Sequence, residues 1–199
     1  MIKQLLALGL LSATLTYAEP PLQPLKPGDK IPDVTVRTEE NQPVSLRKLV
    51  AEKPTVLIFY RGGWCPFCNR HLQSLAGIED DVNKAGAQLV AIGMDTPEKL
   101  KETPDLTKLH YRLFSGSDGE AVKAFGIAFK VDDATYNKMK EVHHIDLETY
   151  SGNNYHTLPY PSVFIAGTDG IITFAHVNPD YKVRLEPAKI LEALQTTRK

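Results

Sequence analysis

The chain has 199 residues, with 23 lysine and arginine residues against 24 aspartate and glutamate residues, and a formal net charge of −1. So balanced a charge gives no reason to expect nucleic acid or an anionic membrane surface as a partner. The length suits one domain with a substantial hydrophobic core, and the sequence contains no internal repeat or low-complexity tract.

Residues 1–18 are typical of a signal peptide. Lys3 supplies a short cationic start, residues 5–15 are apolar, and Thr16-Tyr17-Ala18 fits a cleavage site that leaves Glu19 as the mature N-terminus. A retained membrane anchor is the alternative, but the apolar run is shorter than the roughly 20 residues that span a bilayer. We therefore expect an exported protein, most simply a periplasmic one, without stable membrane insertion after the signal is cleaved.

The first part of the remaining chain predicts a leader followed by a buried strand. Residues 19–30 contain four prolines and predict an extended leader, so residues 31–199 are expected to form the domain. A short strand is expected at 34–38, a turn at 41–43, and a short helix capped by Ser45. Residues 54–60 are continuously apolar and rich in β-branched and aromatic side chains, which is typical of a central strand buried on both faces.

Helices and strands are then expected to alternate, and a hairpin closes the chain. The predicted helices cover residues 66–85, a segment from Thr96 that Pro104 interrupts, 120–125 and 187–196. The predicted strands cover 88–93, 111–114 and a hairpin of 162–166 with 171–174. Residues 132–157 are treated as an insertion, with helical turns at 134–142 and a loop at 150–154. This order predicts an α/β fold, with a central sheet between layers of helices.

The only two cysteines, Cys65 and Cys68, lie where the strand at 54–60 gives way to the helix. Cys65 falls at the expected N-cap, and Pro66 at the first helical position, where proline is favoured. The free N–H groups and the dipole of a helix N-terminus favour a thiolate and lower the pKa of a cysteine there. Cys68 lies one turn further on the same face. The motif therefore predicts a dithiol that cycles to a disulfide and back.

Three other interpretations of the cysteine pair remain. A purely stabilising disulfide would close a loop of only four residues, which gains about 2 kcal/mol against about 3 kcal/mol for fifteen. Metal binding would use Cys65, Cys68 and His71, which have ligand-like spacing, but a closed zinc site normally needs four ligands. A second cysteine pair is absent, and His143 and His144 could contribute further ligands. The third interpretation is a binding domain without redox activity.

Several residues around the cysteines are candidates for supporting roles. Trp64 is expected to shield the pair, and Arg61 either stabilises a thiolate or bound oxyanion or is an ordinary surface arginine. If the peptide bond of Pro161 is cis, a bare carbonyl would lie beside the cysteines; otherwise Pro161 only delays the strand that follows. Three further residues are assigned to surface or supporting positions, not to catalysis: Tyr60, Asn69 and His71.

The run Phe59-Tyr60-Arg61-Gly62-Gly63-Trp64-Cys65-Pro66-Phe67-Cys68 resembles the thioredoxin superfamily. More closely, it is similar to the peroxiredoxin-like branch of the alkyl hydroperoxide reductase / thiol-specific antioxidant (AhpC/TSA) family. The resemblance extends from Pro27 to the C-terminus. It is supported by the runs Asp132-Asp133-Ala134-Thr135, Leu158-Pro159-Tyr160-Pro161 and His176-Val177-Asn178-Pro179-Asp180-Tyr181-Lys182-Val183-Arg184. It implies a thioredoxin-like fold, thiol redox catalysis without a cofactor, and a thiol reductant such as a thioredoxin-like protein as partner.

The resemblance leaves the roles of the two cysteines open. Peroxiredoxins carry Pro-x-x-x-Thr-x-x-Cys; counted back from Cys68, Cys65 stands at the threonine position and Arg61 at the proline position. On that register Cys68 matches the peroxidatic cysteine. Peroxiredoxins also tend to carry an arginine where this chain has Pro161. Both departures are similar to thioredoxin, and in a thioredoxin-like mechanism Cys65 attacks and Cys68 resolves. The expected substrate is a hydroperoxide or a protein disulfide, and a copper or zinc binding or delivery module on the same fold is the alternative.

Overall fold

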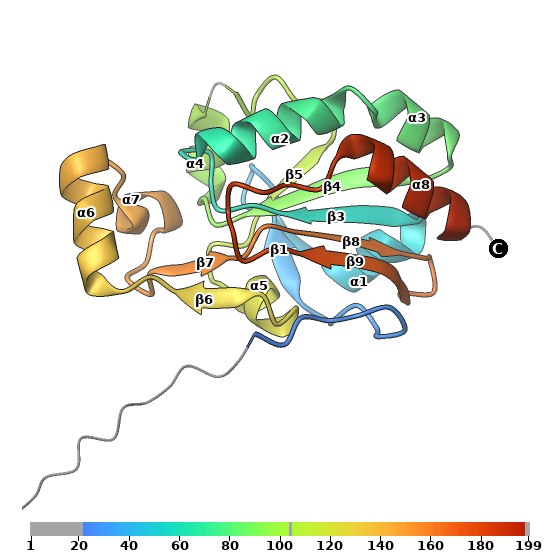
Figure 1. Cartoon of the computed structure of the whole chain (residues 1–199), viewed down its shortest axis with the longest axis horizontal. Coiled ribbons are helices and arrows are strands. Elements are labelled where there is room, and N and C mark those ends of the chain that lie inside the picture. Colours follow the sequence, from blue (N-terminus) through green and yellow to red (C-terminus); the bar gives the residue numbers. More distant parts are fainter. Residues whose placement is uncertain (1–21, 104, 198–199) are drawn as a thin grey trace, which may run out of the picture.

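A seven-stranded mixed sheet forms the middle of the molecule in the computed structural model, which describes residues 22–103 and 105–197 (Figure 1). The strand order is β2-β1-β5-β4-β3-β8-β9. Strands β3, β4 and β5 run parallel, whereas β8 and β9 continue the sheet in antiparallel pairing. The strands are β1 (Thr35–Arg37), β2 (Pro43–Ser45), β3 (Thr55–Phe59), β4 (Gln88–Gly93), β5 (Arg112–Ser115), β8 (Ser162–Ala166) and β9 (Ile172–Val177).

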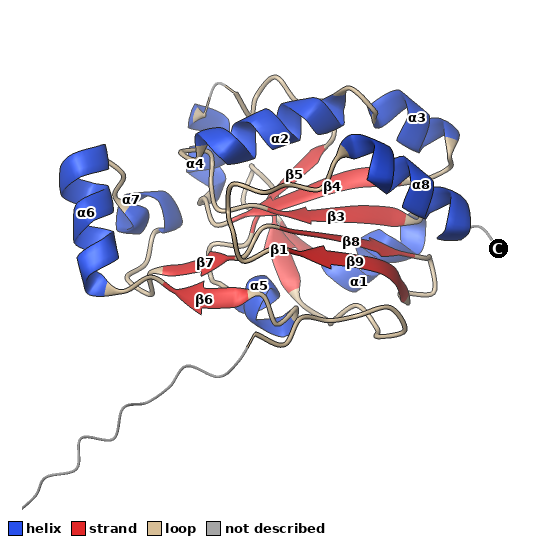
Figure 2. Cartoon of the chain, viewed as in Figure 1, coloured by secondary structure: helices blue, strands red, loops and turns tan. Residues whose placement is uncertain are grey.

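Helices cover both faces of this sheet (Figure 2), as the sequence predicted. Helices α2 (Pro66–Ala76), α3 (Glu79–Lys84), α4 (Pro97–Glu102) and α8 (Pro187–Thr197) supply one hydrophobic core, and α1 (Leu46–Glu52) and α5 (Glu120–Ala124) supply the other. Strand β3 separates the two cores, because Val56 and Ile58 face one while Leu57 and Phe59 face the other. All five of its residues are buried, which confirms the predicted central strand.

The helix predicted over residues 66–85 is wrong as a single element, because the structure divides it into α2 and α3. Gly77 ends α2, and its N–H donates to the carbonyl of Leu75. Ile78 then leaves helical geometry at φ −112°, ψ 5°. The first turn of α3 consists of three acidic residues, which a helix N-terminus favours through its dipole. A new helix start therefore competes successfully with continuation of the first helix.

Most other predicted elements agree with the structure. Ser45 caps α1 by accepting from the N–H of Lys48, and Thr96 caps α4 by accepting from that of Lys99. The predicted C-terminal helix corresponds to α8, and the predicted hairpin to β8 and β9. Strand β2 was not predicted; it pairs with β1 across the tight turn at residues 38–42.

The insertion is more structured than predicted. It consists of α6 (Asp133–His143) and α7 (Leu147–Ser151), and the two-stranded ribbon of β6 (Ala128–Lys130) and β7 (Thr157–Pro159) carries it. The loop predicted at 150–154 is wrong in its first two residues, which end α7. Tyr136 and Met139 of α6 and Leu147 of α7 are buried in the same hydrophobic core as α1 and α5, and polar contacts between residues of the insertion add to this packing.

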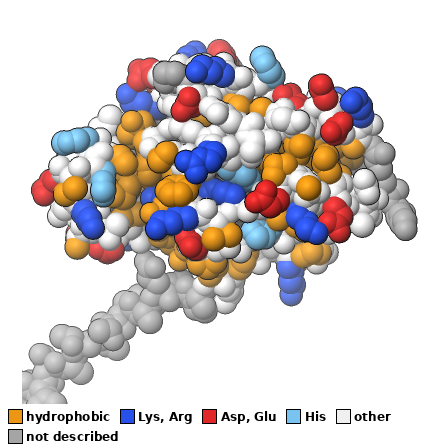
Figure 3. All heavy atoms as spheres, turned by 45° about the horizontal axis from the view of Figure 1, so that its top comes forward, with side chains coloured by type: hydrophobic (Ala, Val, Ile, Leu, Met, Phe, Trp, Pro, Cys, Tyr) orange, Lys and Arg blue, Asp and Glu red, His pale blue; other side chains and the backbone are white. Residues whose placement is uncertain are grey.

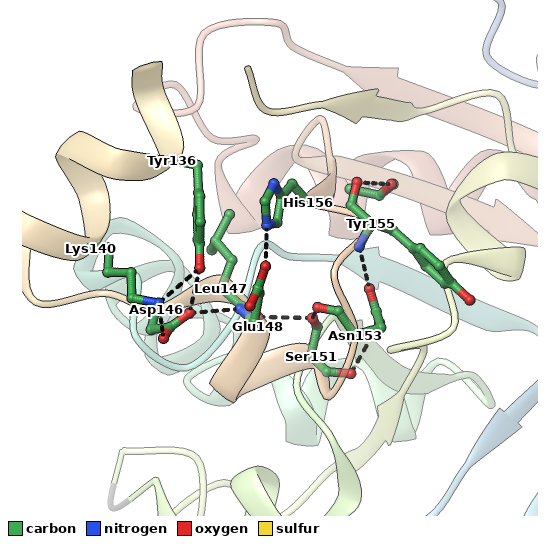
Figure 4. A network of polar contacts seen from close by, with 10 residues as sticks. Tyr136, Lys140, Asp146, Leu147, Glu148, Ser151, Asn153, Tyr155 and His156 are labelled. Carbon is green, nitrogen blue, oxygen red and sulfur yellow. Dashed lines mark hydrogen bonds and ion pairs between the residues drawn. The ribbon is translucent and has the colours of Figure 1, made fainter. Parts of the chain in front are cut away.

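Figure 4 shows those contacts. The Tyr136 hydroxyl donates to the Asp146 carboxylate at 2.9 Å, and Lys140 forms an ion pair with the same carboxylate at 2.9 Å. His156 contacts Glu148 at 2.8 Å. Helix α7 also contacts the main body, because the carbonyl of its Tyr150 accepts from the N–H of Thr96 at 2.8 Å. The insertion therefore borders the carboxyl end of β4.

The described part of the leader, from Leu22, packs along the domain. The N–H of Leu25 donates to the carbonyl of Phe125, and the N–H of Gly28 donates to that of Ile172. Gly126 has φ +67°, and a Cβ there would collide with the carbonyl of Gln23. The predicted signal peptide at residues 1–18 lies outside the described residues. No helix among those described is long and apolar enough to cross a membrane.

Candidate active site

The two cysteines lie at the N-terminus of α2, directly after β3. Cys65 is the N-cap, with φ −94° and ψ 109°, and Pro66 is the first helical residue. The Cys65 carbonyl accepts from the N–H groups of Cys68 and Asn69 at 3.0 Å each. Both thiols are free, and both residues are only 1% exposed. The structure thus confirms the predicted position of the pair at a helix start.

A tight glycine turn carries the chain from β3 into α2. The N–H of Cys65 donates to the carbonyl of Gly62 at 3.0 Å. Gly62 has φ +153°, and a Cβ on it would collide with the indole of Trp64. Trp64 is itself half-buried and packs against Tyr150 of α7, with ring centroids 6.5 Å apart. Trp64 therefore forms a wall of the turn that leads to Cys65.

The surroundings shift the pKa values of the two thiols in opposite directions. A hydrogen bond from the Cys68 thiol is the largest influence on Cys65 and lowers its pKa; burial opposes this. The Cys68 backbone N–H and the positive charges of Arg61 and Arg184 lower it further, to about 6. Burial raises the pKa of Cys68, as does its hydrogen bond to Cys65. Cys65 is therefore the thiol that ionises first.

Two arginines approach the pair from separate parts of the chain. The Arg61 guanidinium lies between two aromatic rings, 4.8 Å from the ring centroid of Trp64 and 4.4 Å from that of Tyr181. Arg184 places Nη2 3.3 Å from Sγ of Cys68. Arg184 ends the run His176–Arg184 that supports the family resemblance, but the sequence predicts no role for it, because 116 residues separate it from Cys68. Only the fold shows that the connection between β9 and α8 crosses the start of α2.

This connection covers the cysteines. Tyr181 packs edge-on against Phe67 with ring centroids 5.7 Å apart, and His71 Nε2 donates to the carbonyl of Leu185 at 3.1 Å. Burial, and next the charge of Arg184, lower the pKa of His71 to about 4. A groove of about 250 Å³ runs beside the cover, lined mainly by Phe67, Arg70, His71, Lys182, Arg184 and Leu185. Figure 3 shows basic side chains among hydrophobic ones near the middle of the face turned toward the viewer.

A buried carboxyl group lies behind the glycine turn. Asp95 follows β4 and is 0% exposed. Its Oδ2 accepts from the N–H of Gly63 at 2.8 Å, while Oδ1 has no hydrogen-bond partner among the described residues. Burial is the main cause that raises the pKa of Asp95 to about 7, and the nearby charge of Cys65 adds to it.

Asp95 was missed in the sequence, although a signal for it exists. The carboxyl ends of neighbouring parallel strands meet at one edge of a sheet, so an acidic residue just after a buried strand is expected near the end of the next. Asp95 follows β4, and the cysteine motif follows β3. Tyr60, at the end of β3, was assigned a supporting or surface position; it is buried, and its ring packs so closely against Gly93 that a Cβ there would collide with it.

The remaining predicted residues have mixed outcomes. The cis alternative for Pro161 is not adopted, since the described residues contain no cis peptide bond. Its carbonyl is not bare either, because it accepts from the N–H of Asn178 at 3.2 Å. Asn69 supports the glycine turn by donating to the carbonyl of Gly63 at 2.7 Å.

The metal-binding interpretation lacks support in the structure. Within residues 22–103 and 105–197, no group of three or more histidine, cysteine, aspartate or glutamate side chains is arranged to hold a metal ion. His143 and His144 belong to the end of α6 in the insertion.

Comparison with known proteins identifies relatives of one kind. The protein-family model described as "AhpC/TSA family" matches residues 27–175. Peroxiredoxin Bcp of Escherichia coli K12 is 27% identical over 106 residues, which cover 53% of this chain and 67% of the relative. Chloroplastic peroxiredoxin Q of Sedum lineare is 31% identical over 100 residues, which cover 50% of this chain and 53% of the relative.

Solved structures show the same fold. Peroxidoxin BcpB from Mycobacterium tuberculosis superposes with a TM-score of 0.68 at 19% identity, over 88% of this chain and 99% of that one. Reduced Prx3 from Vibrio vulnificus in complex with H2O2 superposes with a TM-score of 0.68 at 17% identity, over 85% and 99% of the two chains. The thioredoxin-like α/β fold predicted from the motif is therefore confirmed.

Proposed function

The chain belongs to the AhpC/TSA family, a family of peroxiredoxin-like thiol enzymes, and we propose that it reduces hydroperoxides with Cys65 as the attacking thiolate and Cys68 as the resolving thiol. The observation that carries the assignment of Cys65 is its place as N-cap of α2, where the pKa falls to about 6. A thiolate, and not a thiol, is the nucleophile in this chemistry.

The proposed cycle has three balanced steps. The Cys65 thiolate attacks one oxygen of the hydroperoxide, an S–O bond forms, the O–O bond breaks, and the alkoxide or hydroxide leaves and is protonated. The Cys68 sulfur then attacks the Cys65 sulfur, an S–S bond forms, the S–O bond breaks, and hydroxide leaves as water with the proton that Cys68 gives up. A thiol reductant, such as a thioredoxin-like protein, returns two electrons through a mixed disulfide.

The burial of the pair supports a small substrate over a protein disulfide. Both cysteines are 1% exposed beneath the connection that carries Tyr181 and Arg184. A hydroperoxide needs less displacement of this cover than a folded protein does. The cations beside the sulfurs also favour the negative charge that develops on the leaving oxygen.

Single cysteine variants test the proposal. With Cys68→Ser, dimedone should trap a sulfenic acid at Cys65 after one equivalent of peroxide, and steady-state turnover with thioredoxin and its reductase should fall. With Cys65→Ser, the second-order reaction with peroxide should fall by at least about a hundredfold, since nucleophilic attack is lost. Each variant is the matched control for the other, because both remove one thiol from the same helical turn.

Two outcomes would contradict the assignment in different ways. Rapid sulfenic acid formation at Cys68 in the Cys65→Ser variant would support the peroxiredoxin register, in which Cys68 attacks next to Arg184. Slow reaction with every peroxide, together with mixed disulfides trapped on other proteins by Cys68→Ser, would support disulfide exchange instead.

We also propose that the protein is exported and functions in the periplasm. The proposal rests on the cationic start, apolar run and cleavage pattern in residues 1–18. N-terminal sequencing of the protein from a cell fraction should find Glu19 as the first residue. Recovery of the intact chain in the cytoplasm would refute it.

A further inference from the structure

We propose that Asp95 is a positioning residue of the cysteine pair: it fixes the glycine turn that leads to Cys65, and its carboxyl gains or loses a proton as the charge on Cys65 changes. The proposal rests on the redox role proposed above for the pair, but it concerns a residue on a different strand.

The positioning part follows from contacts. Asp95 is 0% exposed, and its Oδ2 holds the N–H of Gly63 at 2.8 Å, two residues before Cys65. A Cβ on Gly62 would lie 3.0 Å from Oδ1, so the carboxyl group closes the back of both glycines. Neither glycine leaves room for a side chain, since a Cβ on Gly63 would meet Thr103 at 2.7 Å. The turn is therefore clamped between Asp95 and its other neighbours.

The proposed proton exchange follows from the small number of hydrogen-bond donors and the missing cation around the Asp95 carboxyl group. A buried carboxylate normally needs several hydrogen bonds or a cation to compensate for lost hydration. Oδ1 has no hydrogen-bond partner of good geometry in the described part of the chain, where the Tyr60 hydroxyl is the side-chain donor that favours the carboxylate, and the ion pairs found there do not include Asp95. Consistent with this, burial raises its pKa to about 7, close to the pKa of about 6 of Cys65. Two groups that ionise in the same range and repel each other titrate together.

The buried tyrosines near Asp95 and the Cys68 thiol ionise above this range. Tyr60, at the end of β3, favours the charged form of Asp95, but burial raises the pKa of its own hydroxyl well above 10. Burial likewise raises the pKa of Cys68 on α2 and of Tyr111 before β5. The neighbouring elements also carry these charged or titratable side chains: Arg61 after β3, Arg70 and His71 on α2, Glu98, Lys99, Lys101 and Glu102 on α4, Arg112 on β5, Glu148 and Tyr150 on α7, and Arg184 of the covering connection.

Oxidation of the pair then moves a proton. When Cys65 passes from thiolate to disulfide, its negative charge disappears and the Asp95 carboxylate becomes more favourable. The carboxyl group releases a proton to solvent, and no electrons pass through it; the two electrons go to the hydroperoxide. Near pH 7, the reduced protein is therefore expected to hold part of a proton at Asp95 that the disulfide form gives up.

The test is a pH titration of thiolate absorbance at 240 nm with the full reduced chain. The wild type should give a curve broader than a single ionisation, and Asp95→Asn, which keeps an oxygen for the Gly63 N–H, should give a single ionisation at a pH lower by about one unit. Tyr60→Phe removes a group that favours the Asp95 carboxylate and should shift the second phase of the curve to higher pH. Asp105→Asn is the matched control: Asp105 accepts from Asn69 on the outer side of α2 and is half-buried, so the curve should not change.

A carboxyl ¹³C NMR titration gives a second readout that requires no peroxidase activity. The Asp95 resonance should titrate at a lower pH in the disulfide form than in the reduced form. An Asp95→Asn curve identical to wild type, or an Asp95 resonance that ignores the redox state, would overturn the inference. If the wild type shows no peroxidase activity but both titrations behave as expected, the proposed function is refuted and the inference about Asp95 is not.

Discussion

Asp95→Asn is expected to stabilise the folded protein at neutral and alkaline pH, although it removes a charged residue from the candidate active site. Asp95 is fully buried, and burial raises its pKa from 3.8 to about 7. A carboxyl group whose pKa is raised by folding does not lower the free energy of unfolding below pH 3.8, because both states are protonated there. The cost builds up as pH rises from 3.8 to about 7, where the unfolded state has lost the proton and the folded state still holds it, and it is complete above 7, where the folded state buries the charge. An amide has no such titration and still accepts from the N–H of Gly63.

The two pKa values set the size of the effect. The difference of about three units corresponds to roughly 4 kcal/mol at 1.36 kcal/mol per unit. This figure is an upper bound, because water penetration and relaxation reduce the penalty for a real buried charge. Even half of it would shift the melting temperature of a domain of this size by several degrees.

Urea unfolding between pH 4 and pH 8.5 measures the difference between Asp95→Asn and its parent. A Cys65→Ser, Cys68→Ser background removes the thiol titrations and leaves burial, the main cause of the shift, in place. The stability difference should grow in favour of Asp95→Asn by at least about 1.5 kcal/mol from pH 5 to pH 8.5. Asp105→Asn in the same background should show no such trend. A difference for Asp95→Asn that does not change with pH would refute the reasoning.

Three further predictions concern other parts of the structure. Alkylation of Cys65 by iodoacetamide should reach half of its maximal rate near pH 6, and Arg184→Met should move that midpoint upward because a cation is removed; an unchanged midpoint would mean that Arg184 does not act on this thiol. The fold should lose up to about 3 kcal/mol as pH falls from 6.5 to 4, because His71 is buried neutral with a pKa of about 4, and His71→Leu should flatten that part of the profile in urea unfolding. Gly126→Ala should lower the free energy of unfolding by more than about 2 kcal/mol in the same assay, since alanine is strained at φ +67° and its Cβ would meet the leader backbone. Gly170→Ala is the control: its φ is +75° but the space around it is open, so it should cost only about 1 kcal/mol. Equal losses would contradict the close packing of the leader.

Local sequence patterns predicted the elements that depend on neighbouring residues. The apolar run of β3, the proline at the first position of α2 and the cap of Ser45 each act within one strand or one helical turn, so the sequence alone sufficed to place them. The break at Gly77 was missed because α2 and α3 both bury their apolar residues in one core, which hides the change of helix from periodicity.

The candidate site was predictable only in part for the same reason. The position of Cys65 and Cys68 follows from their immediate neighbours. Arg184 and Asp95 reach the pair from other elements, 116 residues away in one case and by way of a second strand in the other. Which thiol ionises first depends mainly on the hydrogen bond between the two thiols and on how deeply each is buried, which the motif alone does not reveal.

In the proposed cycle, the connection over the cysteines would affect oxidation and re-reduction differently. Tyr181 packs against Phe67 and the Arg61 guanidinium, and Arg184 contacts Cys68. A substrate or reductant must displace these side chains to reach the sulfur atoms. A peroxide is small enough to pass with little rearrangement, whereas a protein reductant must bring its own thiol to within bonding distance of a buried sulfur. If the protein cycles as proposed, re-reduction by a protein thiol is therefore expected to be slower than oxidation by a peroxide. In that case a smaller residue in place of Tyr181, which removes the contacts with Phe67 and Arg61, should speed re-reduction more than it speeds the reaction with peroxide.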